Sequence, residues 1–433
     1  MLLTAGFAFP QNPAQEKFFG NSPTDKDVRL PADRVYPRGR LFPFSFYSTG
    51  GGSERKRGEL LPDQEYERDV KEIVNAGVSL IGPQYELQKR LIADAGKYHL
   101  QCFYTVYGLY DGKPISRAVL NSGKPLDAEK LIRETAPLVR DLSKHREIAF
   151  WDIEPNELRF WKKNDVLYLK TMAGIIREND PLKRPIFIYE PCHRRAGDLA
   201  RFLPYQDISG KGMYTNFSGF RKQRIWVRYS MEQELTAIKQ QKDQRKIIPF
   251  AMPEMFQDGP EEELPLIESR VRHDVYCALA NGAKGILVFS ATRRPKFKSR
   301  RKYLDAYLRI CRELRDRSDL SQALLFGRVT ADLEVAVTEG PETIPLKIGK
   351  KILTYPSLSI AQFAWNNARY LLLVNSADKP VKAMIDNLVY GSNVAVQNIL
   401  SQNGGNPFIV PEGNFACELK PYEAVCYKIF LRK

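Results

Sequence analysis

The chain has 433 residues, of which 43% are hydrophobic and 27% are charged, as in an ordinary globular protein that buries a large core over about two domains. Its net charge of +15 favours an acidic partner, either nucleic acid, anionic lipid or anionic polysaccharide. The six cysteines and four histidines form no CxxC pair and no Cys/His cluster, so we expect no metal site and no cofactor. No stretch is long enough to span a membrane.

Residues 1–35 are rich in proline, asparagine and aspartate and are interpreted as a leader segment. The first of them, "MLLTAGFAFPQNPAQ", form a short apolar run that lacks a preceding basic region. This start is either the truncated end of a secretory signal peptide or a disordered terminus. The first interpretation predicts a secreted or periplasmic protein.

Eight apolar runs alternate with helical patterns over residues 36–322. The runs cover residues 41–51, 76–86, 100–108, 147–154, 184–191, 207–216, 246–256 and 282–294. Such alternation predicts parallel strands joined by right-handed crossovers, and eight repeats fit a (β/α)₈ TIM barrel. The alternative is a doubly wound open sheet. It receives weak support, because the glycines of residues 48–59 lack the order of a phosphate-binding turn.

The pattern changes at about residue 327, where helical periodicity ends. From there to residue 433, short runs of alternating hydrophobicity are separated by glycine, asparagine and proline turns. This pattern predicts a small antiparallel β-sandwich domain after the barrel.

The segment "FWDIEPNE" (150–157) places three acids directly after an apolar strand. Burial of a carboxylate costs free energy, so acids at this place call for a functional reason. Side chains alternate along a strand, which puts Asp152 and Glu154 on one face, toward the barrel interior, and Ile153 on the other.

Active sites of TIM barrels lie at the carboxyl ends of the strands. The predicted strand ends supply tyrosines, amides and charged groups, which suit a polyhydroxylated ligand that needs directional hydrogen bonds and aromatic surfaces. We therefore predict a carbohydrate partner. The predicted substrate-binding residues, beyond the catalytic pair below, are Asp152, Asn156, Tyr47, Tyr107, Tyr214, Asn216, Glu190 and Arg293.

Glu154 and Glu254 end the fourth and seventh predicted strands, which lie on opposite sides of a narrow barrel mouth. Two carboxyl groups that flank one bond can hydrolyse a glycoside, one as a protonated acid and the other as an ionised group beside the sugar carbon. We therefore predict a glycoside hydrolase that acts on an oligosaccharide or polysaccharide.

The motifs "WDIEPNELRFW" (151–161) and "IIPFAMPE" (247–254) resemble the fourth and seventh strands of the clan A glycoside hydrolases. "RYLLLVNSADKPV" (369–381) resembles part of the β-sandwich that follows many such barrels. The resemblance implies a retaining enzyme, with Glu154 as acid/base and Glu254 as nucleophile. It further implies that Tyr214 bonds the nucleophile, and the two carboxyl groups are then expected about 5–5.5 Å apart.

Two departures from the family pattern leave alternatives open. Ile153 replaces the asparagine that precedes the acid/base, and an alignment on Asn156 would make Glu157 that residue. The eighth strand lacks the expected tryptophan. The alternative function is therefore an inactive carbohydrate-binding protein on a hydrolase-like barrel.

The basic run "RRPKFKSRRK" (293–302) has two interpretations, a solvated loop with a helix start or an anion-binding rim beside a site. No recognition helix or interleaved aromatic and basic pattern supports nucleic-acid binding. A basic rim for a sulfated or uronic-acid polymer explains the net charge at least as well.

Overall fold

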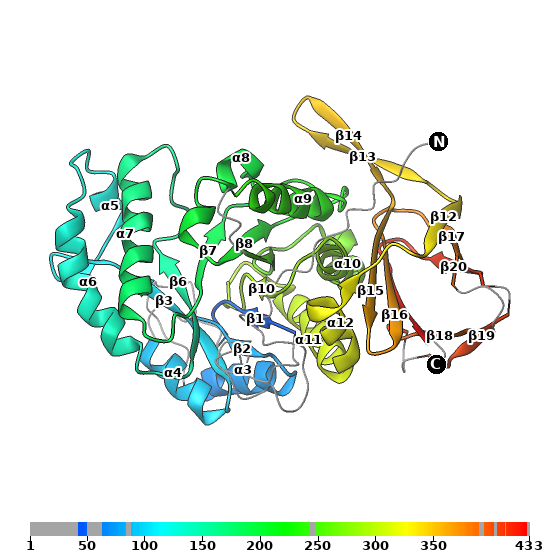
Figure 1. Cartoon of the computed structure of the whole chain (residues 1–433), viewed down its shortest axis with the longest axis horizontal. Coiled ribbons are helices and arrows are strands. Elements are labelled where there is room, and N and C mark those ends of the chain that lie inside the picture. The colour runs from blue at the N-terminus through cyan, green and yellow to red at the C-terminus, as the bar shows by residue number, and fades with distance from the viewer. Residues whose placement is uncertain are drawn as a thin grey trace.

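The computed structural model describes residues 42–49, 63–83, 88–241, 247–388, 394–401, 405–411 and 413–430. The predicted leader (1–35) lies outside the described residues. A barrel occupies the N-terminal part, and a β domain lies against one side of it (Figure 1). None of the helices within the described ranges combines the length and the apolar character that a membrane span requires.

All eight predicted strands are present and form one parallel sheet. Their order is β1 (Phe44–Phe46), β10 (Ile286–Val288), β9 (Ile248–Pro253), β8 (Ile208–Met213), β7 (Ile186–Glu190), β6 (Ile148–Glu154), β3 (Gln101–Tyr107) and β2 (Leu80–Ile81). The edge strands β1 and β2 approach each other, since the Ser79 N–H donates to the Phe44 carbonyl (3.3 Å) and the Ser48 N–H to the Pro83 carbonyl (2.9 Å). The predicted (β/α)₈ barrel is confirmed.

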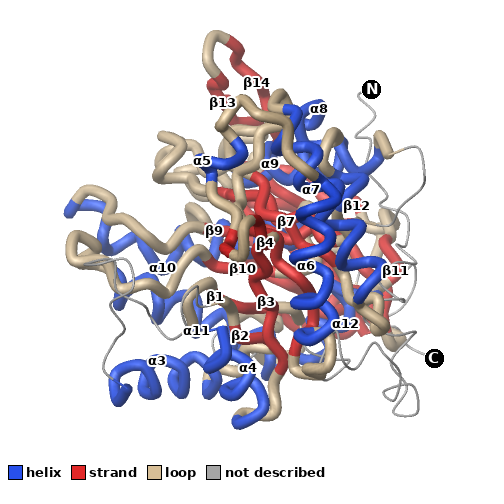
Figure 2. Tube along the Cα trace, turned by 90° about the vertical axis from the view of Figure 1, so that its left-hand side faces the viewer, coloured by secondary structure: helices blue, strands red, loops and turns tan. Residues whose placement is uncertain are grey.

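Helices surround these strands, as the tube view shows (Figure 2). The main ones are α3 (Asp63–Asn75), α4 (Gln88–Lys97), α6 (Ala128–Leu142), α7 (Lys163–Asn179), α9 (Trp226–Lys239), α10 (Ile267–Ala280), α11 (Arg300–Asp316) and α12 (Ser318–Phe326). Helix α6 illustrates how the sequence specifies them. Asp127 caps its first turn by accepting from the Lys130 N–H, and Leu131 and Val139 lie on the buried side.

Four phenylalanines from four strands fill the centre of the barrel. The Phe150 ring lies 5.1 Å from Phe103, 5.7 Å from Phe187 and 6.3 Å from Phe250, measured between ring centroids. Space for these rings requires a glycine in β8, because a Cβ at Gly210 would lie 2.3 Å from the Phe187 side chain. Phe150 therefore marks the inward face of β6, the face that Asp152 and Glu154 share.

The opposite face of β6 is fixed by a buried ion pair. Asp180 accepts from the Trp151 indole N–H (2.8 Å) and pairs with the Arg184 guanidinium (2.9 Å). The remaining Arg184 N–H groups donate to the carbonyls of Ser143, His145 and Ile148. Burial alone would raise the pKa of Asp180, but Arg184 and Trp151 hold it below its usual value.

The predicted antiparallel strands after residue 327 are confirmed as a β domain. One sheet has the order β11 (Arg328–Val329), β15 (Leu358–Trp365), β16 (Ala368–Asn375), β21 (Ala424–Phe430), β18 (Val394–Asn398) and β19 (Phe408–Val410). A second sheet has the order β12 (Glu334–Glu339), β17 (Val381–Asp386) and β20 (Phe415–Leu419). Apolar side chains of both sheets share one core, as a sandwich requires.

The β domain contacts the barrel at two places. Helices α10 and α12 pack against β15 and β16 (Figure 1). In addition, the hairpin of β13 (Thr343–Ile348) and β14 (Lys351–Pro356) reaches toward α9. Its Leu346 is buried against Ile225, Trp226 and Tyr229, so the hairpin is attached to the loop that leads into α9.

We expect Asp180→Ala to destabilise the protein by about 3–5 kcal/mol, because removal of one partner leaves the buried Arg184 charge uncompensated. The free energy of unfolding in urea measures this loss. The control is Asp141→Ala, which removes an exposed pair with Lys144 and should leave the unfolding midpoint unchanged. Equal midpoints for the Asp180 variant and wild type would show that the pair does not hold β6.

Candidate active site

Asp152 is buried on the inward face of β6, with 1% of its surface exposed. Its Oδ2 accepts from the Tyr47 hydroxyl of the first strand region (3.3 Å) and from the Thr105 hydroxyl of β3 (3.0 Å). It forms no ion pair with any described residue. Burial raises the pKa of Asp152 to about 7, although both hydroxyls favour the charged form.

Glu154 ends the same strand and is 5% exposed. Its carboxyl group accepts from the Asn156 backbone N–H (2.5 Å) and side-chain amide (2.8 Å). Burial, and then the negative charge of Asp152, raise its pKa to about 8, against the opposing effects of Asn156 and Arg117. Glu157, the alternative acid/base, is exposed on the following loop, whereas Glu154 is buried.

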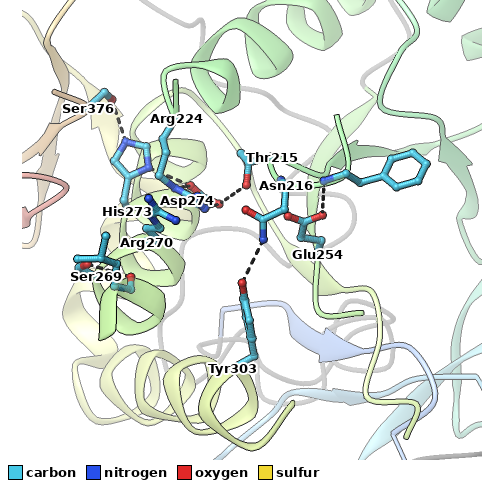
Figure 3. A network of polar contacts seen from close by, with 12 residues as sticks. Thr215, Asn216, Arg224, Glu254, Ser269, Arg270, His273, Asp274, Tyr303 and Ser376 are labelled. Carbon is cyan, nitrogen blue, oxygen red and sulfur yellow. Dashed lines mark hydrogen bonds and ion pairs between the residues drawn. The ribbon is translucent and has the colours of Figure 1, made fainter. Parts of the chain in front are cut away.

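Glu254 follows β9 directly and is 4% exposed. It continues the parallel ladder, where it pairs with Phe289, and its backbone carbonyl accepts from the Tyr307 hydroxyl (3.0 Å). Its carboxyl group accepts from two consecutive backbone N–H groups of the loop after β8, those of Asn216 (2.5 Å) and Phe217 (3.1 Å) (Figure 3).

Burial raises the pKa of Glu254 to about 7, while the two backbone N–H groups and the Arg224 charge act against that increase. Glu254 forms no ion pair with any described residue. The Nε2 amide of Gln257 lies 3.4 Å from its second oxygen. The carboxyl group is therefore oriented by neutral donors, which leave it free to change protonation state.

A polar network holds the loop that binds Glu254 (Figure 3). Asp274 of α10 accepts from the Thr215 hydroxyl (3.3 Å) and pairs with Arg224 (2.9 Å). His273 connects this carboxylate to the β domain, since its Nδ1 lies 2.9 Å from Asp274 and its Nε2 lies 2.9 Å from the Ser376 hydroxyl. Despite burial, Arg224 and His273 hold the pKa of Asp274 below its usual value.

Aromatic rings line the space between the two sides of the mouth. The half-buried Phe289 ring lies 5.6 Å from Tyr47, 6.0 Å from Tyr214 and 6.5 Å from Tyr189, measured between centroids. Tyr47 bonds Asp152, and Tyr214 lies close enough to Glu254 for that charge to raise its pKa further, after burial and Tyr189. One aromatic wall therefore connects the carboxyl groups of β6 with Glu254.

The structure brings most of the predicted site residues together. Tyr47, Asp152, Asn156 and Asn216 contact the two glutamates directly or through one neighbour. Tyr214 lies near Glu254, but its hydroxyl bonds Tyr189, and the donors to the Glu254 carboxyl within the described residues are Asn216, Phe217 and Gln257. Tyr107 also lies here, because it pairs with Glu154 in the register of β3 and β6.

Two predicted residues lie elsewhere. Glu190 is buried on the outward side of β7, where it pairs with Arg194 (2.5 Å) and accepts from the Gln206 amide (3.0 Å). Arg293 binds Asp69 and Glu65 of α3, both at 2.6 Å. Neither side chain is available to a ligand in the mouth.

Sequence reasoning missed Thr105 and Phe289. Thr105 shares the inward face of β3 with Tyr107, so strand alternation was a sufficient signal. Phe289 stands at the end of the eighth strand, where only a tryptophan was expected, so an aromatic residue of either kind at this position was a sufficient signal. Within the part of the chain that the structure describes, no three His, Cys, Asp or Glu side chains are grouped so as to hold a metal ion.

No protein-family model and no curated protein matches this sequence. Solved structures do match its fold. An α-amylase from Geobacillus thermoleovorans, complexed with acarbose, has a TM-score of 0.57 at 10% identity, over 91% of this chain and 99% of that one. A GH27 β-L-arabinopyranosidase from Geobacillus stearothermophilus, complexed with arabinose, has a TM-score of 0.52 at 10% identity, over 92% and 99% of the two chains.

A third structure, an Anoxybacillus α-amylase, has a TM-score of 0.56 at 9% identity, over 91% of this chain and 98% of that one. This chain has a glycoside hydrolase-like fold. The predicted resemblance is confirmed for the barrel and the β domain. Sequence identities this low establish only a shared fold.

We expect Glu154→Gln to change how stability depends on pH. Below pH 4.5, the pKa of an unfolded glutamate, Glu154 is protonated in both the folded and the unfolded chain. Between pH 4.5 and about 8 it ionises only when the chain unfolds, so the free energy of unfolding falls as pH rises. A neutral glutamine removes this loss. Urea unfolding should show the variant more stable than wild type at pH 8, by at least about 2 kcal/mol, and nearly equal at pH 4.5.

Glu157→Gln is the matched control for that measurement, since the same substitution at an exposed position should leave the pH dependence of stability unchanged. Parallel curves for the Glu154 variant and wild type would contradict a buried, protonated Glu154.

Proposed function

We propose that this protein is a retaining glycoside hydrolase, with Glu154 as acid/base and Glu254 as nucleophile. The observation that supports this best is the burial of two glutamates at the carboxyl ends of β6 and β9, without an ion pair to any described residue. The buried Glu190 and Asp180, which lie on the outer side of the barrel, each pair with an arginine instead.

In the first step, a Glu254 oxygen forms a bond to the anomeric carbon while the bond to the leaving oxygen breaks. That oxygen takes the proton of Glu154. A pKa of about 8 keeps this proton on Glu154 at neutral pH, and the charge of Asp152 contributes to the increase.

In the second step, Glu154 accepts a proton from water, and the water oxygen replaces Glu254 at the anomeric carbon. The N–H groups of Asn216 and Phe217 stabilise the Glu254 carboxylate as it leaves. Because the donors belong to the backbone of one loop, they hold both oxygens of Glu254 in place throughout the cycle.

The substrate is proposed to be an oligosaccharide or polysaccharide. Two exposed aromatic side chains suit stacking on sugar rings, Trp161 (59% exposed) on the loop after β6 and Phe217 (63% exposed) on the loop after β8. They follow the strands that carry Glu154 and that bind Glu254, so sugars on either side of the cleaved bond would reach them. A secreted or periplasmic location fits a polymeric substrate.

Substitution of the two glutamates tests the proposal in a screen of aryl glycosides and polysaccharides. We expect Glu254→Gln to abolish turnover and Glu154→Gln to lower kcat about 10²- to 10⁴-fold on substrates with poor leaving groups. The loss in the Glu154 variant should be much smaller on dinitrophenyl glycosides, whose leaving group needs no proton. Glu157→Gln is the control and should retain full activity.

Mass spectrometry of the protein treated with a 2-fluoro glycoside should find the sugar on the peptide that carries Glu254. Glycan binding by wild type without any cleavage would instead identify an inactive carbohydrate-binding protein.

The pH dependence of kcat/KM is expected to be bell-shaped. Activity should rise as Glu254 ionises, with a limb near pH 7, and fall as Glu154 loses its proton, with a limb near pH 8. Measured with a substrate whose leaving group needs a proton, the residual activity of Glu154→Gln should lack the alkaline limb. An alkaline limb that persists in this variant would assign the acid to another residue.

A further inference from the structure

A cavity of about 590 Å³ lies beside the mouth, within the usual volume range of small-molecule sites. Its lining comprises Asn216 and residues 218–223 of the loop after β8, together with Lys347 of the β13–β14 hairpin. The two domains therefore build this cavity jointly.

The hairpin is held in place next to the cavity. Leu346 is buried against Trp226, and the backbone N–H of Lys347 donates to the Gln223 side-chain oxygen (3.4 Å). These contacts fix the backbone of Lys347 and leave its ammonium group beside the cavity. The Gln223 amide nitrogen, which has no partner among the described residues, is available to a hydroxyl or carboxylate.

The lining has an excess of positive charge. Arg221 pairs through its Nε with Glu263 (2.8 Å), but Glu263 also pairs with Arg270 (2.5 Å), so one carboxylate serves two guanidinium groups. Lys222 and Lys347 are exposed, and neither forms an ion pair with any described residue. Their charges remain to be balanced by a ligand or by solvent ions.

The cavity also offers an aromatic surface. The Phe220 ring lines it and stacks on Trp226 with 4.2 Å between centroids and 8° between planes. This contact fixes the orientation of Phe220. An aromatic ring beside cations and an amide is the set of groups that suits a charged sugar, through its apolar face, its anionic group and its hydroxyls.

Asn216 connects the cavity to the proposed nucleophile, because the same residue lines the cavity and donates its N–H to Glu254. We propose that the cavity is a subsite for a sugar unit that carries a carboxylate or sulfate group, next to the unit that reacts at Glu254. This inference rests on the proposed glycosidase function and makes its substrate an anionic glycan.

The basic run 293–302 is a weaker candidate for the anion site. Three of its arginines are engaged by acids, mainly from α3: Arg293 by Asp69 and Glu65, Arg300 by Asp69, and Arg301 by Glu72 and Asp305. The cations of the cavity, in contrast, have one carboxylate partner among them.

Binding measured on the full chain with the Glu254→Gln substitution separates recognition from catalysis. The probes are oligogalacturonate, its carboxyl-reduced neutral counterpart, and a sulfated oligosaccharide, each titrated by calorimetry. We expect at least one anionic probe to bind more tightly than the neutral one, with an affinity that falls as salt increases. Addition of Lys222→Gln and Lys347→Gln should weaken it at least about 10-fold, to the affinity of the neutral probe.

Lys350→Gln is the matched control, because it removes an equal charge from the same hairpin without changing the cavity lining. Equal affinity for anionic and neutral probes, no binding of any probe, or equal weakening by the control would overturn the subsite. Whether the carboxylate or the sulfate probe responds identifies the anionic group.

The two proposals fail in distinguishable ways. Hydrolysis of neutral glycosides without preference for an anionic substrate would leave the catalytic proposal intact and remove the subsite. Binding of an anionic probe that depends on Lys222 and Lys347, without hydrolysis of any glycan, would support the subsite and contradict the catalytic proposal.

Discussion

The candidate site depends on one constraint, the burial of carboxyl groups that have no cationic partner among the described residues. Asp152, Glu154 and Glu254 lie at one barrel mouth, and all three lose hydration there. Their raised pKa values express that cost, which the folded chain has to offset through the aromatic core around Phe150 and the helix packing outside. A chain selected for stability alone would place apolar or ion-paired groups at these positions.

The two sides of the mouth are supported differently. Asp152 and Glu154 depend on the rigid strand β6, whose outer face is fixed by the Asp180 and Arg184 pair. Glu254 depends on the loop after β8, which Asp274 anchors through Thr215 and Arg224. That anchor continues through His273 to the β domain, so this domain supports the site as well as covering the barrel.

The sequence was sufficient for the barrel and for the central carboxylates, because strand alternation and strand order determine which side chains reach the mouth. It was insufficient where a side chain's partner depends on packing. Arg293 binds Asp69, which precedes it by 224 residues, and Glu190 turns outward to Arg194, four residues further along the loop after β7. Neither pairing follows from local pattern, and the same holds for Lys347, which reaches the barrel only through the hairpin.

The net charge of +15 could not locate an anion site, because a total charge does not identify which cations lack an acidic partner. Three of the seven basic residues in the densest run pair with acids, mainly of α3, whereas Lys222 and Lys347 beside the mouth form no ion pair with any described residue. Raised pKa values matter for an anionic substrate as well. A protonated Glu154 does not repel an approaching anion, and the nearby lysines offset the charge of an ionised Glu254. A protonated Glu154 and the lysines beside the mouth therefore both favour an anionic ligand.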